Sequence, residues 1–234
     1  GGTRIVKKGL PFSGDISYSK DEEADAHAEN IKVIEGEFHF DYVKGDLRIT
    51  NIKMGIAGLH NIENAVAAIT VALLLEIDQH KIVTALANFS GAKRRFEYIV
   101  RQQNVIYIDD YAHHPEELRA FLSSLKKLYP AKKITVVFQP HLFSRTRDFV
   151  EGFAEVLGMA DDLLLMEIYP ARELPIEGVT SSWLLEKIDL KNKRVVTPEQ
   201  VLEYVENEKP ELVVTVGAGD IDRLVKPLKA IIAK

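Results

Sequence analysis

The sequence predicts an α/β protein whose carboxy-terminal part is a mainly parallel sheet with helices on both faces. From residue 95 onward, short apolar, β-prone runs alternate with segments of helical spacing, a pattern typical of parallel sheets covered by helices. Residues 1–94 differ, because short polar and β-prone pieces there precede one long apolar run. The length of 234 residues suits one large domain or two modest ones. We expect two, over residues 1–94 and 95–234, with the boundary near residues 92–98.

The amino-terminal part is expected to begin with strands and to continue with two helices. Residues 31–43 predict two strands joined by a tight turn, and residues 46–54 continue the β pattern. The Ala- and Leu-rich run over residues 58–75 predicts a buried helix that begins near Asn61. A second helix is expected over residues 79–89.

The carboxy-terminal part is expected to alternate five strands with helices. Strands are expected at residues 105–108, 134–138, 163–168, 194–196 and 212–216. Helices are expected from Pro115, which suits a first helical turn, and over residues 149–157, 182–188, 198–206 and after Gly219. Pro227 should kink the last helix or place its start later, because proline breaks a helix interior.

Composition narrows the class of protein. With 46% hydrophobic and 28% charged residues, the chain has a globular composition, and its net charge of −5 argues against a nucleic-acid binder. The absence of cysteine excludes disulfide and thiolate chemistry and fits a reducing cytoplasm. No apolar run reaches membrane-spanning length, so no membrane partner is expected. The chain does not begin with methionine, so we treat it as a possible fragment.

A first polar motif, Asp109-Asp-Tyr-Ala-His-His-Pro-Glu116, is placed after the strand expected at residues 105–108. Adjacent acids at a strand end can bind a metal, accept hydrogen bonds from ribose hydroxyls, or simply solvate a loop. Tyr111, His113 and His114 favour a ligand role, because imidazole carries protons or binds anions near neutral pH. Neighbouring histidines cannot both point into one pocket from regular structure, so one of them is expected to pack or cap the next helix.

A second polar motif contains His141, Arg145 and Arg147 and follows the strand expected at residues 134–138. Guanidinium groups bind carboxylate and phosphate through two parallel hydrogen bonds. A solvated first turn of helix is the plainer interpretation, but cations there oppose the helix dipole. We therefore favour a ligand role, and we expect the two motifs to meet at the carboxyl ends of adjacent strands around an anionic substrate.

A third motif, Gly58-Leu-His-Asn-Ile-Glu-Asn-Ala-Val-Ala-Ala68, opens the long apolar helix. Asn61 is a candidate N-cap, a role worth about 1 kcal/mol. Alternatively Asn61 and Asn64, three residues apart on one helix face, offer amides that can bind an adenine edge. The later Gly217-Ala-Gly219 is weak evidence for phosphate binding, and a tight strand–helix turn is favoured there.

Together these motifs resemble those of the Mur ligases, most specifically the branch that adds alanine. The third motif resembles the ATP-binding helix of the central domain, and Lys93-Arg-Arg-Phe-Glu97 resembles the segment that joins it to the last domain. The resemblance spans nearly the whole chain. It implies the end of a central α/β ATP-binding domain followed by a complete Rossmann-like carboxy-terminal domain. Leu142 departs from the pattern, since many alanine-adding members carry arginine there, and so does Lys93, where glycine is common.

The resemblance implies an ATP- and Mg²⁺-dependent carboxylate–amine ligase that joins L-alanine to UDP-N-acetylmuramate through an acyl phosphate. It implies that the cofactor contacts are made by the residues His60, Asn61, Asn64, Arg95 and Asp110. It implies catalytic roles for His113, His141 and Arg145, and substrate contacts by Tyr111, His114 and Arg147. No metal ligands are expected here, because the magnesium-binding residues belong to the part of the family's sequence that this chain lacks.

Two sequence features limit this interpretation. No Gly-x-x-x-x-Gly-Lys-[Ser/Thr] motif is present to hold ATP phosphates, so the chain is expected to be inactive alone. The murein tripeptide recycling ligase shares the first motif but not the second, and is the nearest alternative. A metallohydrolase with zinc or manganese on Asp109, Asp110, His113, His114 and His141 is another, since such clusters suit these metals. A non-catalytic domain that binds an acidic ligand is the third.

Overall fold

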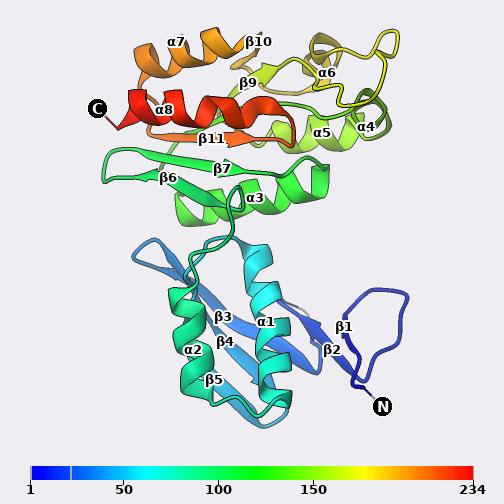
Figure 1. Ribbon diagram of the computed structural model, residues 1–234, viewed down its shortest axis with the longest axis vertical. Helices are drawn as coiled ribbons and strands as arrows, with labels where there is room; N and C mark the ends of the chain where they lie inside the picture. The colour runs from blue at the N-terminus through cyan, green and yellow to red at the C-terminus, as the bar shows by residue number, and fades with distance from the viewer. Residues whose placement is uncertain (1, 22, 234) are drawn as a thin grey trace. The chain divides into compact units, whose positions relative to one another are not determined.

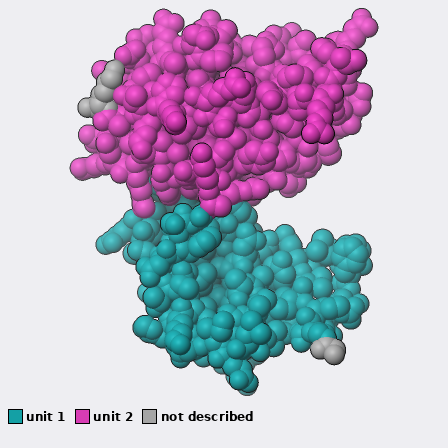
Figure 2. Space-filling view, viewed as in Figure 1, with its two compact units in different colours: residues 1–91, 123–129 teal, residues 92–122, 130–234 magenta. Residues whose placement is uncertain are grey.

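The computed structural model describes residues 2–21 and 23–233 and divides into two compact units. Unit 1 comprises residues 1–91 and 123–129, and unit 2 comprises residues 92–122 and 130–234 (Figure 2). No helix among the described residues is both long and apolar enough to span a membrane.

Unit 1 contains a five-stranded sheet in the order β1-β2-β3-β4-β5, with helices α1 and α2 packed against it (Figure 1). The β1–β2 and β2–β3 pairs are parallel, and the β3–β4 and β4–β5 pairs are antiparallel. Its elements are β1 (Ile5–Lys7), β2 (Ile16–Ser19), β3 (Ala26–Ile34), β4 (Glu37–Lys44), β5 (Leu47–Lys53), α1 (Leu59–Leu74) and α2 (Gln79–Asn88).

Helix α1 folds because one of its faces is apolar at helical spacing. Ile62, Val66 and Ile69 are fully buried on that face. Thr70 lies among them and satisfies its hydroxyl by donating to the Val66 carbonyl, 2.7 Å away, and by bonding to Tyr42 Oη at 3.0 Å. The helix begins at Leu59, two residues before the predicted start, and the predicted strands and second helix of this part are present.

Unit 2 is built on a six-stranded sheet in the order β10-β9-β8-β11-β7-β6. All neighbouring strands are parallel except the antiparallel edge pair β6–β7. Its strands are β6 (Glu97–Arg101), β7 (Ile106–Asp110), β8 (Ile134–Phe138), β9 (Asp162–Met166), β10 (Lys193–Val196) and β11 (Leu212–Val216). Its helices are α3 (Pro115–Leu128), α4 (Phe143–Asp148), α5 (Val150–Leu157), α6 (Ser181–Lys187), α7 (Pro198–Glu208), the 3₁₀ helix η1 (Asp220–Leu224) and α8 (Val225–Ile232).

Helices cover both faces of this sheet, as predicted. Helices α7 and α8 pack together over one face, and α3 lies on the opposite face (Figure 1). The three central strands β7, β8 and β11 are buried along their whole length, which explains why they are mostly apolar, apart from Asp109 and Asp110 at the end of β7 and one threonine in each of the other two. Helix α8 starts at Val225, so Pro227 lies in its first turn, where the predicted late start places it.

The order of the strands corrects one expectation. Strands β7 and β8, which precede the two polar motifs, are not adjacent, because β11 pairs with both of them. The last strand of the sheet therefore lies between the first two parallel ones. The carboxyl ends of β7 and β8 still lie on the same side of the sheet, where its parallel strands end, because β11 is parallel to both.

Candidate active site

Aromatic, imidazole and guanidinium side chains from three segments meet at the carboxyl ends of β7, β8 and β9. We call Tyr111, His113, His141, Arg145 and Tyr169 the histidine cluster. Its rings follow one another at centroid separations of 5.3 Å (Tyr111–His113), 6.1 Å (His113–His141) and 5.6 Å (His141–Tyr169). The two polar motifs thus meet as predicted, although β11 separates their strands.

Local backbone structure fixes the His141 side of this cluster. The Leu142 N–H donates to the Tyr169 carbonyl at 2.9 Å, and the Tyr169 N–H donates to the Pro140 carbonyl at 2.8 Å. These bonds hold the two loops together, and the Tyr169 ring stacks on His141 at an interplanar angle of 19°. Leu142 adopts a left-handed conformation with φ of 75°, which is uncommon for a bulky residue and turns the chain into α4.

His141 lies two residues before α4 and Arg145 is the third residue of that helix, and their side chains meet. Arg145 Nη1 lies 3.4 Å from His141 Nδ1. Burial lowers the pKa of His141, and the nearby Arg145 cation and His113 lower it further. The neutral form of His141 is therefore favoured near neutral pH. Because a guanidinium only donates, Nδ1 of that ring is the acceptor, and Nε2 carries the hydrogen.

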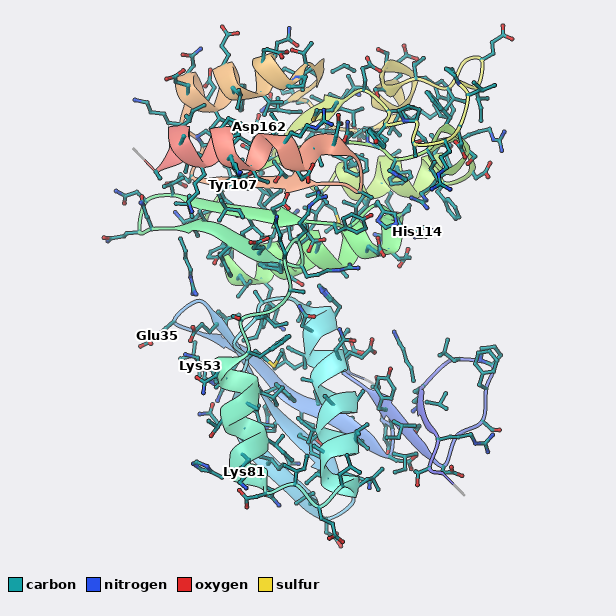
Figure 3. The ribbon with its side chains drawn as sticks, in the orientation of Figure 1. Glu35, Lys53, Lys81, Tyr107, His114 and Asp162 are labelled. Carbon is teal, nitrogen blue, oxygen red and sulfur yellow. The ribbon has the colours of Figure 1, made fainter. Side chains whose placement is uncertain are left out.

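His113 and His114 have different environments. His113 Nδ1 donates to the Tyr111 carbonyl at 2.8 Å, so the lone pair of its neutral ring is on Nε2. The ring of His114, which is labelled in Figure 3, instead packs on Phe149 between α4 and α5, with centroids 4.5 Å apart. Its Nδ1 accepts the Glu116 N–H in the first turn of α3 at 3.4 Å. The structure thus places His113 in the cluster, whereas His114 caps the helix that follows, as expected of one member of the pair.

Asp109 and Asp110 were expected to follow a strand, and this was wrong: they are the last two residues of β7 and both are buried. Successive side chains of a strand point to opposite faces, so the two carboxylates cannot share one site. Asp109 lies on the same face as Tyr107, whose side chain belongs to the core beneath α7 and α8 (Figure 3). Asp110 points to the other face.

The Asp110 carboxylate is held by backbone groups. It accepts hydrogen bonds from the N–H groups of Phe96 at 2.7 Å and Ala112 at 2.8 Å. Burial raises its pKa to about 6, while these two bonds and the nearby Arg95 cation favour the charged form. Near neutral pH the carboxylate is therefore mostly ionised, and it fixes the backbone on both sides of the candidate site.

The two arginines of the Lys93-Arg-Arg-Phe-Glu97 segment also differ. Arg94 forms an ion pair with Asp109, Nε to Oδ2 at 2.9 Å, and its side chain is only 13% exposed. Arg95 is exposed, and its guanidinium carbon lies 5.7 Å from the centre of the Tyr111 ring. Of the two, Arg95 is the arginine whose charged group remains accessible to a ligand.

The two glycines of Gly217-Ala-Gly219 support the turn interpretation of that motif. A Cβ on Gly217 would lie 2.7 Å from the Gln139 carbonyl oxygen, and its φ is 148°. A Cβ on Gly219 would lie 2.3 Å from Gln139 Oε1 and 2.7 Å from Tyr169 Cβ. Both positions exclude a side chain because the backbone passes close to the β8 loop and to Tyr169.

In unit 1, His60, Asn61 and Asn64 lie in the first turns of α1. The Asn61 side chain is not an N-cap: it is the third residue of the helix, and its amide donates to the Ala57 carbonyl at 2.6 Å. Gly58 is the N-cap and makes no side-chain bond. Asn61 and Asn64 border a hollow of about 360 Å³ whose other walls are apolar, formed by Met54, Ile56, Ala65, Ala68, Ala85, Leu86 and Phe89.

Arg147 is not drawn into the histidine cluster. Its guanidinium bonds to the neighbouring Asp148, Nε to Oδ1 at 2.8 Å, and its side chain is half exposed.

Glu173 was not among the residues expected to act in the site. Its carboxylate accepts the Ser144 N–H at 2.9 Å and the Ser144 hydroxyl. These bonds hold the loop that carries Tyr169 to the start of α4. The sequence signal for this loop is the segment Tyr169-Pro-Ala-Arg-Glu173, which resembles the alanine-adding Mur ligases and was expected to form a pocket wall.

The geometry does not support a metallohydrolase. Asp109 and Asp110 are committed to Arg94 and to backbone N–H groups, and His114 packs on Phe149. Across residues 2–21 and 23–233, no group of three or more histidine and acidic side chains is arranged to hold a metal ion.

Comparison with protein-family models matches residues 94–219 to the glutamate ligase domain of Mur ligases and residues 6–72 to the Mur ligase middle domain. The chain belongs to the Mur ligase family. Two curated relatives are named UDP-N-acetylmuramate–L-alanine ligase. The one from Cytophaga hutchinsonii is 47% identical and covers 92% of this chain and 46% of that protein. The one from Parabacteroides distasonis is 42% identical and covers 100% of this chain and 52% of that protein.

Solved structures of Mur ligases share the fold. The UDP-N-acetylmuramate-alanine ligase MurC of Thermotoga maritima matches with a TM-score of 0.73 and 26% identity, over 92% of this chain and 47% of that chain. A MurF from Acinetobacter baumannii matches with a TM-score of 0.72 and 20% identity over 97% of this chain and 51% of that chain, which shows the fold alone. This Mur ligase chain thus spans about half the length of the curated relatives it matches.

Proposed function

We propose that this chain forms part of an ATP-dependent ligase that joins L-alanine to UDP-N-acetylmuramate in peptidoglycan precursor synthesis. The observation that carries the proposal is the histidine cluster, found in a chain 47% identical to a relative of that name. In this reaction ATP transfers its γ-phosphoryl group to the carboxylate of UDP-N-acetylmuramate, which becomes an acyl phosphate, and ADP leaves. The alanine amine then attacks the acyl carbon, a C–N bond forms, the C–O bond to phosphate breaks, and phosphate leaves. We place the reaction in the cytoplasm, where ATP is available.

The residues in unit 1 fit the adenine of ATP. Asn61 and Asn64 offer amide groups beside an otherwise apolar hollow of about 360 Å³, a volume within the usual range of small-molecule pockets. A planar base needs apolar walls and a few polar groups at its edge, and the hollow offers both. His60 lies in the same turn of α1 and remains a proposed nucleotide contact.

In unit 2, Arg95 and Asp110 remain proposed nucleotide contacts. Arg95 presents an exposed guanidinium beside Tyr111, suited to phosphate oxygens. Asp110 remains a proposed ribose acceptor, although both of its oxygens already accept backbone N–H groups. ATP supplies the phosphoryl group when bound, and the chain's residues supply position and charge. The described residues form no cluster that would hold Mg²⁺, so we assign no ligand of that ion to them.

The histidine cluster provides distinct groups for the amino-acid substrate. Arg145 can pair with the alanine carboxylate through two hydrogen bonds. The Nε2–H of neutral His141 can donate to an oxygen that gains negative charge, and burial favours that neutral form. The Nε2 lone pair of His113 can accept the proton that the alanine ammonium loses. Tyr111, His114 and Arg147 remain proposed substrate contacts, the last two from outside the cluster.

The experiment is a ligase assay of the complete protein that contains this chain, with phosphate release measured in the presence of ATP and UDP-N-acetylmuramate. We expect phosphate release to depend on L-alanine. His113→Gln should lower kcat by about a hundredfold, the usual scale of acid–base catalysis. His80→Gln, at an exposed position of α2, is the matched control and should leave kcat unchanged. Phosphate release that ignores L-alanine would contradict the proposal. The 234-residue chain alone should release none, since it has no phosphate-binding loop.

A further inference from the structure

Residues 92–97, which we call the connector, are held in an unfavourable backbone conformation. Arg94 and Phe96 have φ of 59° and 49°, in the left-handed region that costs on the order of 1–3 kcal/mol for each non-glycine residue. Each of the two N–H groups donates to a carboxylate at 2.7 Å, that of Arg94 to Glu97 and that of Phe96 to Asp110. Charge-assisted hydrogen bonds of this kind can offset the backbone cost.

The Arg94 side chain fastens the connector to two strands of the sheet. Its Nε donates to Asp109 Oδ2 on β7 at 2.9 Å, and its Nη2 donates to the Gly217 carbonyl after β11 at 2.6 Å. Only a guanidinium carries donors far enough apart, in one plane, to make both bonds at once. Lysine, with donors on a single nitrogen, cannot reproduce this pair of contacts.

A buried chain of hydroxyls orients Asp109 toward Arg94. The Thr215 hydroxyl donates to Asp109 Oδ1 at 2.6 Å, and the Tyr107 hydroxyl lies 3.1 Å from Thr215 Oγ1. Because Thr215 uses its only hydrogen on Asp109, Tyr107 donates to Thr215. Burial raises the pKa of the Tyr107 hydroxyl, which keeps it protonated as that donor. Both Asp109 oxygens are thus bonded, and the side chain is fully buried.

The connector contacts the candidate site through Tyr111. The Arg94 carbonyl accepts the Tyr111 N–H at 2.8 Å, so the same residue holds the first member of the histidine cluster. Arg94 and Arg95 both place a guanidinium carbon near the Tyr111 ring, at 5.2 Å and 5.7 Å from its centre. The Arg94 guanidinium donates its hydrogen bonds to Asp109 and Gly217, whereas Arg95 remains exposed.

We propose that Arg94 is a positioning residue that, through Asp109 and Gly217, fixes Arg95 and Tyr111 for the nucleotide without contacting it. That a nucleotide is the ligand rests on the proposed function. The anchor, by which we mean the bonds from Arg94 to Asp109 and Gly217, is observed within unit 2 itself. Asp109 is then the partner of a structural arginine and neither a metal ligand nor a ribose acceptor. Gly217 contributes its carbonyl oxygen as the second acceptor for Arg94.

The first test measures amide hydrogen exchange in the 234-residue chain, where no ligase activity is needed. In Arg94→Lys we expect exchange of the Tyr111 and Phe96 amides to rise at least about tenfold, since local opening loses the anchor. Amides of β8 should keep their protection. Lys93→Gln, at the exposed position next to Arg94, is the matched control and should leave all of these amides unchanged. Unchanged protection of Tyr111 and Phe96 in Arg94→Lys would overturn the proposal.

The second test measures KM for ATP and kcat in the complete protein. Arg94→Gln should raise KM for ATP about tenfold with kcat within about threefold, and adding Asp109→Asn should raise KM no further, because the first change has already broken the anchor that the two residues share. Arg95→Gln should raise KM as well, but there the added Asp109→Asn should raise KM further.

A further rise of KM in the double variant Arg94→Gln/Asp109→Asn would mean that Arg94 acts independently of Asp109, and the positioning role would be wrong. If the parent protein ligates no L-alanine, the proposed function fails, yet the exchange experiment and equilibrium binding of ATP still decide the role of Arg94. Arg94→Lys keeps the charge, so the exchange test can be performed even if Arg94→Gln folds poorly.

Discussion

The two sides of the candidate site in unit 2 are built differently. On the β7 side, the polar groups are bonded to each other or to the backbone: Arg94 to Asp109, Asp109 to Thr215 and Asp110 to two N–H groups. On the β8 side, His141 and Arg145 share one long contact of 3.4 Å, and both are partly exposed. Arg94, Asp109 and Asp110 thus form a frame. His141 and Arg145 are available to a ligand, as are Arg95 and His113 beside the frame. Substitutions should therefore affect stability within the frame and activity at the ligand groups.

The largest expected effect is on the frame. Arg94→Met should lower the free energy of unfolding of the 234-residue chain by about 3–5 kcal/mol, because it leaves the Asp109 carboxylate buried without a cation. Urea denaturation measures this change. Arg95→Met, one residue away and exposed, should change stability by no more than about 0.5 kcal/mol. Equal losses in the two variants would erase the distinction between these arginines.

The next effect belongs to the β8 side. Arg145→Ala in the complete protein should reduce kcat/KM for L-alanine about a hundredfold, or about 2.7 kcal/mol, because the carboxylate loses its guanidinium partner. Thermal unfolding should be nearly unchanged, and this is the control on folding. Arg119→Ala, whose guanidinium pairs with Glu155 on the surface of α3 and α5, should keep full activity. Loss of stability rather than activity in Arg145→Ala would place Arg145 in the frame.

A smaller effect is expected where the two sides touch. Gly219→Ala should cost about 1–3 kcal/mol of stability, because the new methyl group would overlap Gln139 Oε1 and Tyr169 Cβ, 2.3 and 2.7 Å away. Displacing Tyr169 from His141 should also weaken L-alanine binding, measurable as a higher KM. Gly158→Ala, with its nearest neighbours at 3.3 Å, is the matched control and should be tolerated. A stable Gly219→Ala variant would show that the loop yields easily.

The smallest effect is a pH dependence of the frame. The pKa of Asp110 is about 6 in the folded chain and 3.8 as its ordinary value, so the folded state binds a proton more tightly than the unfolded state. Lowering the pH from 7 to 5 should therefore add about 1 kcal/mol of stability through this group. Urea denaturation of parent and Asp110→Asn proteins at both pH values isolates it, since the variant lacks this contribution. An identical pH dependence in both would contradict the raised pKa.

Much of the fold of unit 2 was predictable because its central strands are fully buried. Strands β8 and β11 are almost entirely apolar, so residues 134–138 and 212–216 were predicted with the observed bounds. Strands β1, β2 and β6 were not predicted, since they are short or lie at a sheet edge and include polar residues. The prediction that β7 and β8 are adjacent was also wrong, because periodicity identifies strands without showing which of them pair, and β11 lies between the two.

The sequence predicted which residue types meet in the site, but not which of them are buried and which remain accessible to a ligand. His113, His141 and Arg145 meet as expected, because strand ends of one parallel sheet meet at one edge. That Asp109 is buried could not be predicted, since its partners Arg94 and Thr215 lie 15 and 106 residues away. Which of Arg94 and Arg95 is accessible depends on those same long-range contacts, and a local sequence pattern contains none of them.

The central place of β11 also bears on synthesis of the protein. A nascent chain that has left the ribosome only as far as α7 already holds β7 and β8, yet has no strand to bridge them. Until residues 212–216 emerge, two apolar strand edges remain open to other chains, a known route to aggregation. Completion of the sheet, and with it the assembly of the histidine cluster, must therefore be among the last events of its folding.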